Sequence, residues 1–171
     1  LITVGDVTGH GVPSAMITAS AKSSLDTVRN ITKSHLSLTF LLEEMNKTIF
    51  AAAKRKFVMT FFALAYDRRR SEITFANAGH NFPIVIRQRE GRPEVRALVA
   101  RGNRLGDIEA SRYREHKLGV QPGDLIVLYT DGITEYRNRS GEEYGERRFR
   151  RLLQRNFGSS AMSIGESVRR D

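Results

Sequence analysis

The sequence predicts an α+β protein in which helices precede and follow a block of strands. Two amphipathic helical patterns occupy the first third of the chain. Segments rich in β-branched and aromatic residues, separated by turn residues, fill the middle, and a helical pattern returns near the C-terminal end. These three observations predict the class.

The first helical pattern follows Pro13, which is well placed in a first helical turn because its missing N–H would be unpaired there anyway. It places apolar residues at helical spacing over 13–28: Ile17, Ala21, Leu25 and Val28. Ser37 can cap a second helix, whose apolar positions are Leu38, Leu41, Leu42, Met45 and Ile49. We expect the two helices to form a pair.

The middle of the chain predicts two hairpins. FVMTFFALAYD (57–67) and EITFANAGH (72–80) flank a charged turn and form the first, and FPIVIRQ (82–88) and PEVRALV (93–99) form the second. RYREHKLGV (112–120) supplies another strand, and the apolar start of DLIVLYTDGITE (124–135) is typical of a strand buried on both faces. Amphipathic GERRFRRLLQRN (145–156) predicts a helix, and the tail after it begins one more.

Length and composition indicate one globular domain over residues 1–171. The chain is 40% hydrophobic and 27% charged, which fits a protein with a sizeable core. No apolar run approaches the roughly 20 residues that span a bilayer, so we expect no membrane span. The absence of cysteine excludes a disulfide scaffold, a thiolate zinc site and a cysteine nucleophile, and it favours a cytoplasmic location.

The formal charge of +9 raises the question of nucleic-acid binding. The arginines are spread along the chain with no aromatic platform between them, so we expect ordinary solvated surfaces and no nucleic acid as partner. A basic patch that meets an acidic partner or nucleic acid is the less favoured interpretation.

Two acids stand out because each follows a predicted hydrophobic strand and lies beside a glycine: Asp6 and Asp131. If the two strands are neighbours in one sheet, the carboxylates converge at its rim and need a compensating charge. With no cysteine and no closely spaced histidine pair, oxygen ligands suit Mg²⁺ or Mn²⁺ better than zinc. Taken alone, each of the two motifs is more often a plain turn at the end of a strand, and spacing does not decide between a turn and a metal site.

Four features in order carry a family resemblance: GDVTGHG (5–11), the helical pair, FANAGHNFP (75–83) and GDLIVLYTDGITE (123–135). Together they resemble the SpoIIE/RsbU branch of the metal-dependent PP2C-type serine/threonine phosphatases, from residue 4 to about residue 153. The resemblance implies a PP2C-like α/β sandwich, with two mainly antiparallel sheets flanked by helices and two Mn²⁺ or Mg²⁺ ions at the sheet edge.

The resemblance also implies roles for individual residues. Asp6 matches the acid that bridges both ions, the backbone carbonyl of Val7 ligates one ion, and Asp131 ligates the other. Such an ion pair activates water for direct attack on phosphorus, and a general acid must protonate the leaving alkoxide. His10 is the nearest candidate for that acid, although it could instead hydrogen-bond the loop. His80 is expected to support the loop by packing, and Thr8 either touches substrate or caps the turn.

The chain departs from the family pattern at both ends. It begins within an apolar run, after the point where a further acidic strand is expected, and it stops before a terminal acidic pair. We therefore expect a piece of a longer protein, with the first and last strands and their acids outside it, that binds metal weakly and hydrolyses phosphate poorly on its own. An exposed sheet edge that pairs with another chain, as in a homodimer, is expected as well.

The resemblance points to a phosphorylated STAS-domain anti-sigma-factor antagonist as the substrate. It also implies an attached sensory or receiver domain, and the helical pair is either a switch that couples this domain to the metal site or a passive scaffold. The alternative function is an inactive adaptor that acts by protein contact alone. A nucleic-acid binder, which would show salt-sensitive affinity for DNA, ranks last.

Overall fold

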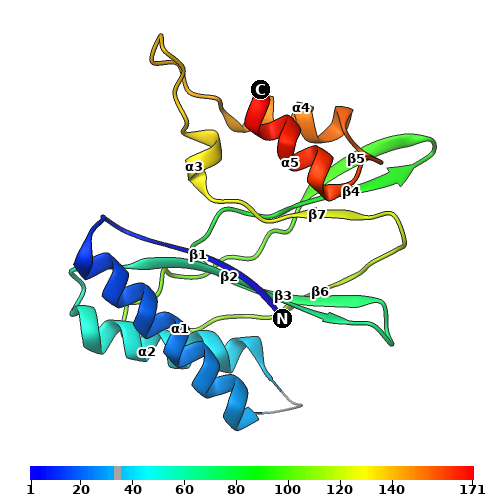
Figure 1. Ribbon diagram of the computed structural model, residues 1–171. Helices are drawn as coiled ribbons and strands as arrows, with labels where there is room; N and C mark the ends of the chain where they lie inside the picture. The colour runs from blue at the N-terminus through cyan, green and yellow to red at the C-terminus, as the bar shows by residue number, and fades with distance from the viewer. Residues whose placement is uncertain (33–35) are drawn as a thin grey trace. The chain divides into compact units, whose positions relative to one another are not determined.

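The computed structural model describes residues 1–32 and 36–171, which form two units, each built around one antiparallel sheet (Figure 1). The first unit comprises residues 1–80 and 100–120, and the second comprises residues 81–99 and 121–171. The helices and the two antiparallel sheets confirm the predicted α+β class. The organisation as one domain stays a prediction.

The sheet of the first unit has the strand order β1-β2-β3-β6, with every neighbouring pair antiparallel. Its strands are β1 (Ile2–Val7), β2 (Met59–Asp67), β3 (Glu72–Ala78) and β6 (His116–Gly119). The β2–β3 hairpin and the β6 strand confirm the predictions for these segments. Among the described residues β1 pairs with β2 alone, so β1 is an edge strand.

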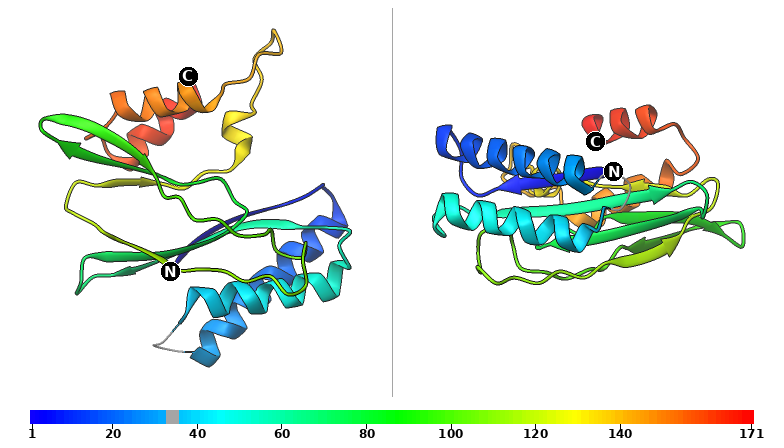
Figure 2. Two further views of the ribbon diagram at one scale, coloured as in Figure 1. Left: turned by 180° about the vertical axis from the view of Figure 1, so that it is seen from behind. Right: turned by 90° about the horizontal axis from the view of Figure 1, so that it is seen from below.

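Two helices lie side by side over this sheet (Figure 2): α1 (Val12–Thr32) and α2 (Leu38–Ala53). The Ser37 hydroxyl accepts a hydrogen bond from Phe40 N at 3.2 Å, which confirms the predicted cap. Neither of these helices, nor any other helix within residues 1–32 and 36–171, is long and apolar enough to cross a membrane.

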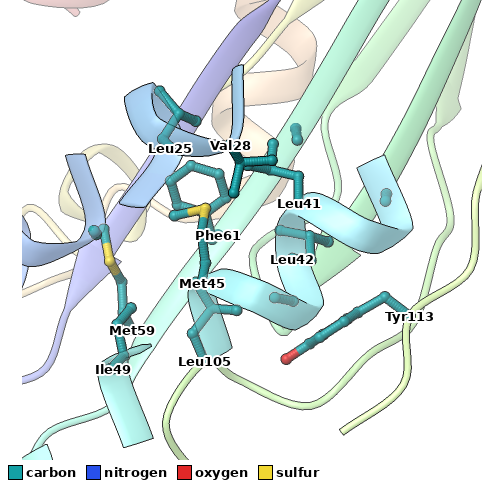
Figure 3. Close-up of a cluster of buried hydrophobic side chains, with 14 of the residues drawn as sticks. Leu25, Val28, Leu41, Leu42, Met45, Ile49, Met59, Phe61, Leu105 and Tyr113 are labelled. Carbon is teal, nitrogen blue, oxygen red and sulfur yellow. The ribbon is translucent and has the colours of Figure 1, made fainter. Parts of the chain in front are cut away.

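The core of the first unit lies between the two helices and the sheet (Figure 3). The predicted apolar positions of both helices are buried, and those with no exposed surface at all are Leu41, Leu42, Met45 and Ile49. They pack with β2 residues such as Met59 and Phe61 and with Leu105 from the segment before β6. Because α1 follows directly after the loop that begins at Asp6, this core anchors that loop from one side.

The second unit holds a three-stranded sheet of order β5-β4-β7 and three helices. Its elements are β4 (Ile84–Arg89), β5 (Arg92–Ala97), β7 (Leu125–Val127), α3 (Asp131–Thr134), α4 (Glu146–Arg155) and α5 (Ala161–Arg170). Its core joins Ile84 and Ile86 of β4 to Phe149 and Leu153 of α4 and Ile164 of α5. The predicted second hairpin and the two terminal helices are therefore confirmed.

The strand predicted for the apolar run after Asp124 is wrong in two respects. β7 covers only Leu125–Val127, and all three residues are half-buried rather than enclosed on both faces. Among the described residues β7 pairs with β4 alone, so it is also an edge strand. β1 and β7 also belong to different sheets, so the two acids do not follow neighbouring strands of one sheet. An apolar run in the sequence predicts that its side chains are buried, but it does not predict which strands will be its neighbours in the sheet.

β7 is anchored at its start by an ion pair with β4. Arg87 donates from Nε to Asp124 Oδ1 at 2.9 Å and from Nη2 to Oδ2 at 2.7 Å, and the Asp124 side chain is only 4% exposed. Hydrogen bonds from Arg87 hold the pKa of Asp124 below its usual value, because they stabilise the charged form. The pair thus fixes the strand that leads to Asp131.

Asp124→Asn is expected to lower the free energy of unfolding by about 1.5–3 kcal/mol at pH 7, the range for hydrogen bonds to charged groups. A lowered folded-state pKa adds stability above the unfolded pKa of about 3.9, and that stability is lost as the pH falls through the folded pKa. Urea titrations should therefore show the difference between wild type and variant shrinking below about pH 4. Asp26→Asn, at an exposed α1 ion pair, is the control and should change stability by less than about 0.5 kcal/mol.

Candidate metal centre

Asp6 lies exposed near the end of β1, directly opposite Thr60 of β2. The residue before it must be glycine for steric reasons. A Cβ on Gly5 would lie 2.6 Å from a ring carbon of Phe61 and 2.7 Å from the Met59 methyl carbon, closer than real contacts allow. Glycine therefore lets β1 lie against these side chains and sets the position of Asp6.

The loop after Asp6 is held by hydrogen bonds from both of its sides. Thr8 Oγ1 donates to Val58 O at 3.2 Å and accepts from Val58 N at 3.1 Å, while Ser14 Oγ donates to Thr8 O at 3.2 Å. Gly9, with φ of 84°, occupies the left-handed region that glycine tolerates best. These bonds favour the turn-supporting role for Thr8 over contact with substrate, and they leave His10 exposed on the same loop.

His80 is buried, with 5% of its surface exposed, at the end of the predicted NAGH segment. Its backbone N–H donates to Asn77 Oδ1 at 2.7 Å, and Asn77 Nδ2 donates back to the His80 carbonyl at 2.9 Å. The imidazole Nδ1 lies 2.8 Å from Thr60 Oγ1. This arrangement agrees with the loop-supporting role expected for His80.

Thr60 is the residue that the sequence analysis missed. Its hydroxyl lies between His80 Nδ1 at 2.8 Å and the backbone carbonyl of Asp6 at 3.4 Å, so it links the buried imidazole to the strand that carries the predicted metal ligand. A single hydroxyl in the otherwise apolar run VMTFFALA was the available signal. Its partner could not be read from the sequence, because the β1–β2 register was unknown.

Asp131 is the first residue of α3, four residues beyond the last residue of β7. It is half-buried, and its backbone carbonyl accepts from Glu135 N at 2.7 Å and from Thr134 Oγ1 at 3.2 Å. Asp131 belongs to the second unit and Asp6 to the first, so their convergence on one centre stays a prediction. Within the described part of the chain, no three His, Asp or Glu side chains form a group able to hold a metal ion.

The donor chemistry at these positions fits a hard divalent cation. Asp6 offers an exposed carboxylate and Asp131 a half-buried one, and Val7 adds a half-buried backbone position next to Asp6. Oxygen donors of this kind suit Mg²⁺ and Mn²⁺, whereas the sulfur ligands of a thiolate site are absent from the sequence.

The family described as Stage II sporulation protein E (SpoIIE) matches residues 1–171. The phosphoserine phosphatase RsbU of Bacillus subtilis (strain 168) is 26% identical over 168 residues, which are 98% of this chain and 48% of RsbU. The chain thus spans about half the length of this curated relative.

Solved structures agree on the fold. The SiaA-PP2C domain of Pseudomonas aeruginosa has a TM-score of 0.81 at 25% identity, covering 98% of this chain and 65% of that domain. The catalytic domain of the serine threonine protein phosphatase PstP, solved in complex with two manganese ions, has a TM-score of 0.66 at 14% identity, covering 98% of this chain and 80% of that one. The PP2C-like fold is therefore confirmed.

Thr60→Val is expected to lower the free energy of unfolding by about 1–3 kcal/mol, because the buried His80 imidazole loses its hydroxyl partner in a low-dielectric environment. Thr60→Ser keeps the hydroxyl and is the matched control, expected to retain most of the wild-type stability. Urea unfolding monitored by circular dichroism measures both. Equal stabilities for the Val and Ser variants would contradict the linking role of Thr60.

Proposed function

Because the chain belongs to the SpoIIE family of PP2C-type serine/threonine phosphatases, we propose that it is the catalytic part of a metal-dependent protein phosphatase. It removes phosphate from phosphoserine or phosphothreonine on a regulatory protein. The observation that carries the proposal is the family match over residues 1–171. The motif resemblance adds Asp6 and Asp131 as the proposed metal ligands.

In this proposal Asp6, the Val7 carbonyl and Asp131 hold two Mn²⁺ or Mg²⁺ ions. When bound, such ions supply an activated water and offset the charge of the phosphoryl group. The chain's own residues position the donors: Gly5 permits the approach of β1 to β2, and the Thr60 hydroxyl bridges His80 to the Asp6 carbonyl.

His10 is proposed as the acid that protonates the leaving alkoxide. It lies exposed on the loop that starts one residue after Val7, so it can exchange its proton with solvent and approach a substrate at Asp6 without rearrangement of the core. The loop itself is fixed at Thr8 and Ser14, which limits how far His10 can move from Asp6.

The proposed substrate is a phosphorylated STAS-domain anti-sigma-factor antagonist, and an attached sensory or receiver domain controls the activity in the whole protein. The name phosphoserine phosphatase, carried by RsbU, supports a phosphoserine substrate. A cytoplasmic location and a homodimer formed along the edge of β1 are parts of the same proposal.

The first test replaces each acid by its amide. In the whole protein, Asp6→Asn and Asp131→Asn are each expected to reduce Mn²⁺-dependent release of phosphate from a phosphoserine peptide by at least about 100-fold, because a lost ligand weakens the metal centre directly. Asp26→Asn, at a partly exposed position on α1, is the matched control and should retain wild-type activity. Isothermal titration with Mn²⁺ should show weaker binding for the first two variants only.

Full activity in either amide variant would remove that acid from the metal centre. Stable binding of a phosphoprotein with no turnover in the wild type, at saturating Mn²⁺, would favour the alternative function of an adaptor that acts by contact.

A second test concerns the helical pair as a switch. Leu41 and Leu42 are fully buried, so alanine there would destabilise the protein by about 2–5 kcal/mol and obscure regulation. Phe40 lies on the same helix with 44% of its surface exposed. In the whole protein, Phe40→Ser is expected to alter activation by the attached domain while leaving Mn²⁺ affinity and thermal stability near wild type; unchanged activation would favour a passive scaffold.

A further inference from the structure

Two neighbouring hollows lie on the surface of the second unit, and Arg148 and Asp171 line both of them. The first has a volume of about 340 Å³ and is bordered by Gly132 and Ile133, the two residues that follow Asp131. The second has a volume of about 550 Å³ and lies between α4 and α5. The two hollows therefore adjoin at Arg148 and Asp171, and the first one borders the residues that directly follow Asp131.

The second hollow is strongly basic. Arg151, Arg155 and Arg170 line it together with Arg148. Arg148 is held by Asp171, with Nε donating to Oδ2 at 3.0 Å. Arg170 forms an ion pair with Glu166, in which Nη2 lies 3.5 Å from Oε2. Arg151 and Arg155 are exposed, and neither forms an ion pair with any described residue.

The stability of α4 explains only part of this charge. Arg155 lies in the last turn of α4, where the helix dipole favours a cation, but Arg151 does not. The helix has the sequence ERRFRRLLQR, and its buried positions are Phe149, Leu152 and Leu153. Arg151 and Arg155 lie four residues apart on the solvent side, where like charges destabilise a helix by a few tenths of a kcal/mol. A ligand of opposite charge would reverse this repulsion.

The hollow is also preformed. Asn156 Nδ2 donates to Leu152 O at 2.9 Å, and Ser167 Oγ lies 3.3 Å from Asn156 Oδ1, so polar contacts join the end of α4 to α5 along the lining. The two helices that carry the arginines are therefore already joined before a ligand binds.

We propose that the two hollows form one docking track for the phosphoprotein substrate, in which acidic residues at a distance from the phosphorylated residue bind Arg151 and Arg155. A neutral or apolar stretch of the substrate crosses the first hollow, against Ile133 and Tyr136, toward Asp131. The inference deepens the proposed function, since it names the substrate as a protein with an acidic segment beside its phosphorylation site.

The lining favours an acidic protein over nucleic acid. Glu142 and Glu143 line the first hollow, so a polyanion with a phosphate at every step would meet carboxylates as it left the arginines. Among the described residues, the aromatic rings of the track, Tyr136 and Tyr144, line the first hollow and none lines the second. The arginines therefore lack the interleaved rings on which the bases of a bound single strand usually stack.

The test uses two fluorescent phosphoserine peptides that are identical except for a run of glutamates or of glutamines placed away from the phosphoserine. Anisotropy without divalent metal measures binding independently of turnover. The glutamate peptide is expected to bind wild type about three- to tenfold more tightly than the glutamine peptide, and the Arg151→Gln/Arg155→Gln variant should lose this preference. Arg68→Gln/Arg114→Gln removes two exposed arginines from the first unit and should keep it.

With Mn²⁺, the same double variant should raise KM for the glutamate peptide without changing kcat, as expected for a contact that binds substrate and transition state equally. Glutamate-dependent binding without hydrolysis of either peptide would support the track while contradicting the phosphatase. Hydrolysis of both peptides with equal affinity would contradict the docking track and leave the proposed phosphatase activity intact. Tighter binding of duplex DNA that depends on Arg151 and Arg155, with no preference between the peptides, would overturn it in favour of nucleic acid.

Discussion

The packing of β1 against β2 is the constraint on which the position of Asp6, the first proposed metal ligand, depends. Gly5 leaves room for the Phe61 and Met59 side chains against this part of β1, and the antiparallel register sets Asp6 opposite Thr60. Any Cβ at Gly5 would press on Phe61 and Met59, which belong to the core beneath α1 and α2. The position of one exposed carboxylate is therefore tied to the packing of the whole first unit.

The buried His80 supports the strands beside Asp6 through hydrogen bonds. His80 is buried because Asn77 satisfies its backbone on both sides and Thr60 satisfies one ring nitrogen. A buried imidazole without such partners would carry a large desolvation penalty. The NAGH segment is thus a hydrogen-bonded turn at the end of β3 that supports β2 beside Asp6. This supporting role requires no contact with substrate.

In the second unit, the segment before Asp131 is held mainly by side chains, because the three-residue strand β7 forms few backbone hydrogen bonds with β4. The bidentate Arg87–Asp124 pair fixes where β7 begins, and Tyr129 packs edge-on against Phe149 at 4.9 Å just beyond its end. Asp131 therefore emerges from a segment anchored at both ends. The basic surface of α4 lies on the opposite side of that helix from Phe149, which leaves its arginines available to a partner.

The sequence by itself determined the helices, the two hairpins and the family, because apolar periodicity and ordered motifs are local properties of the chain. It also named Asp6 and Asp131, whose neighbouring glycines made them conspicuous. Only the tertiary structure decided that β1 and β7 belong to different sheets, that β7 is short, and that Thr60 stands between His80 and Asp6. The physical reason is that strand register and sheet membership arise from contacts between distant segments, which the spacing of residues along one segment does not encode.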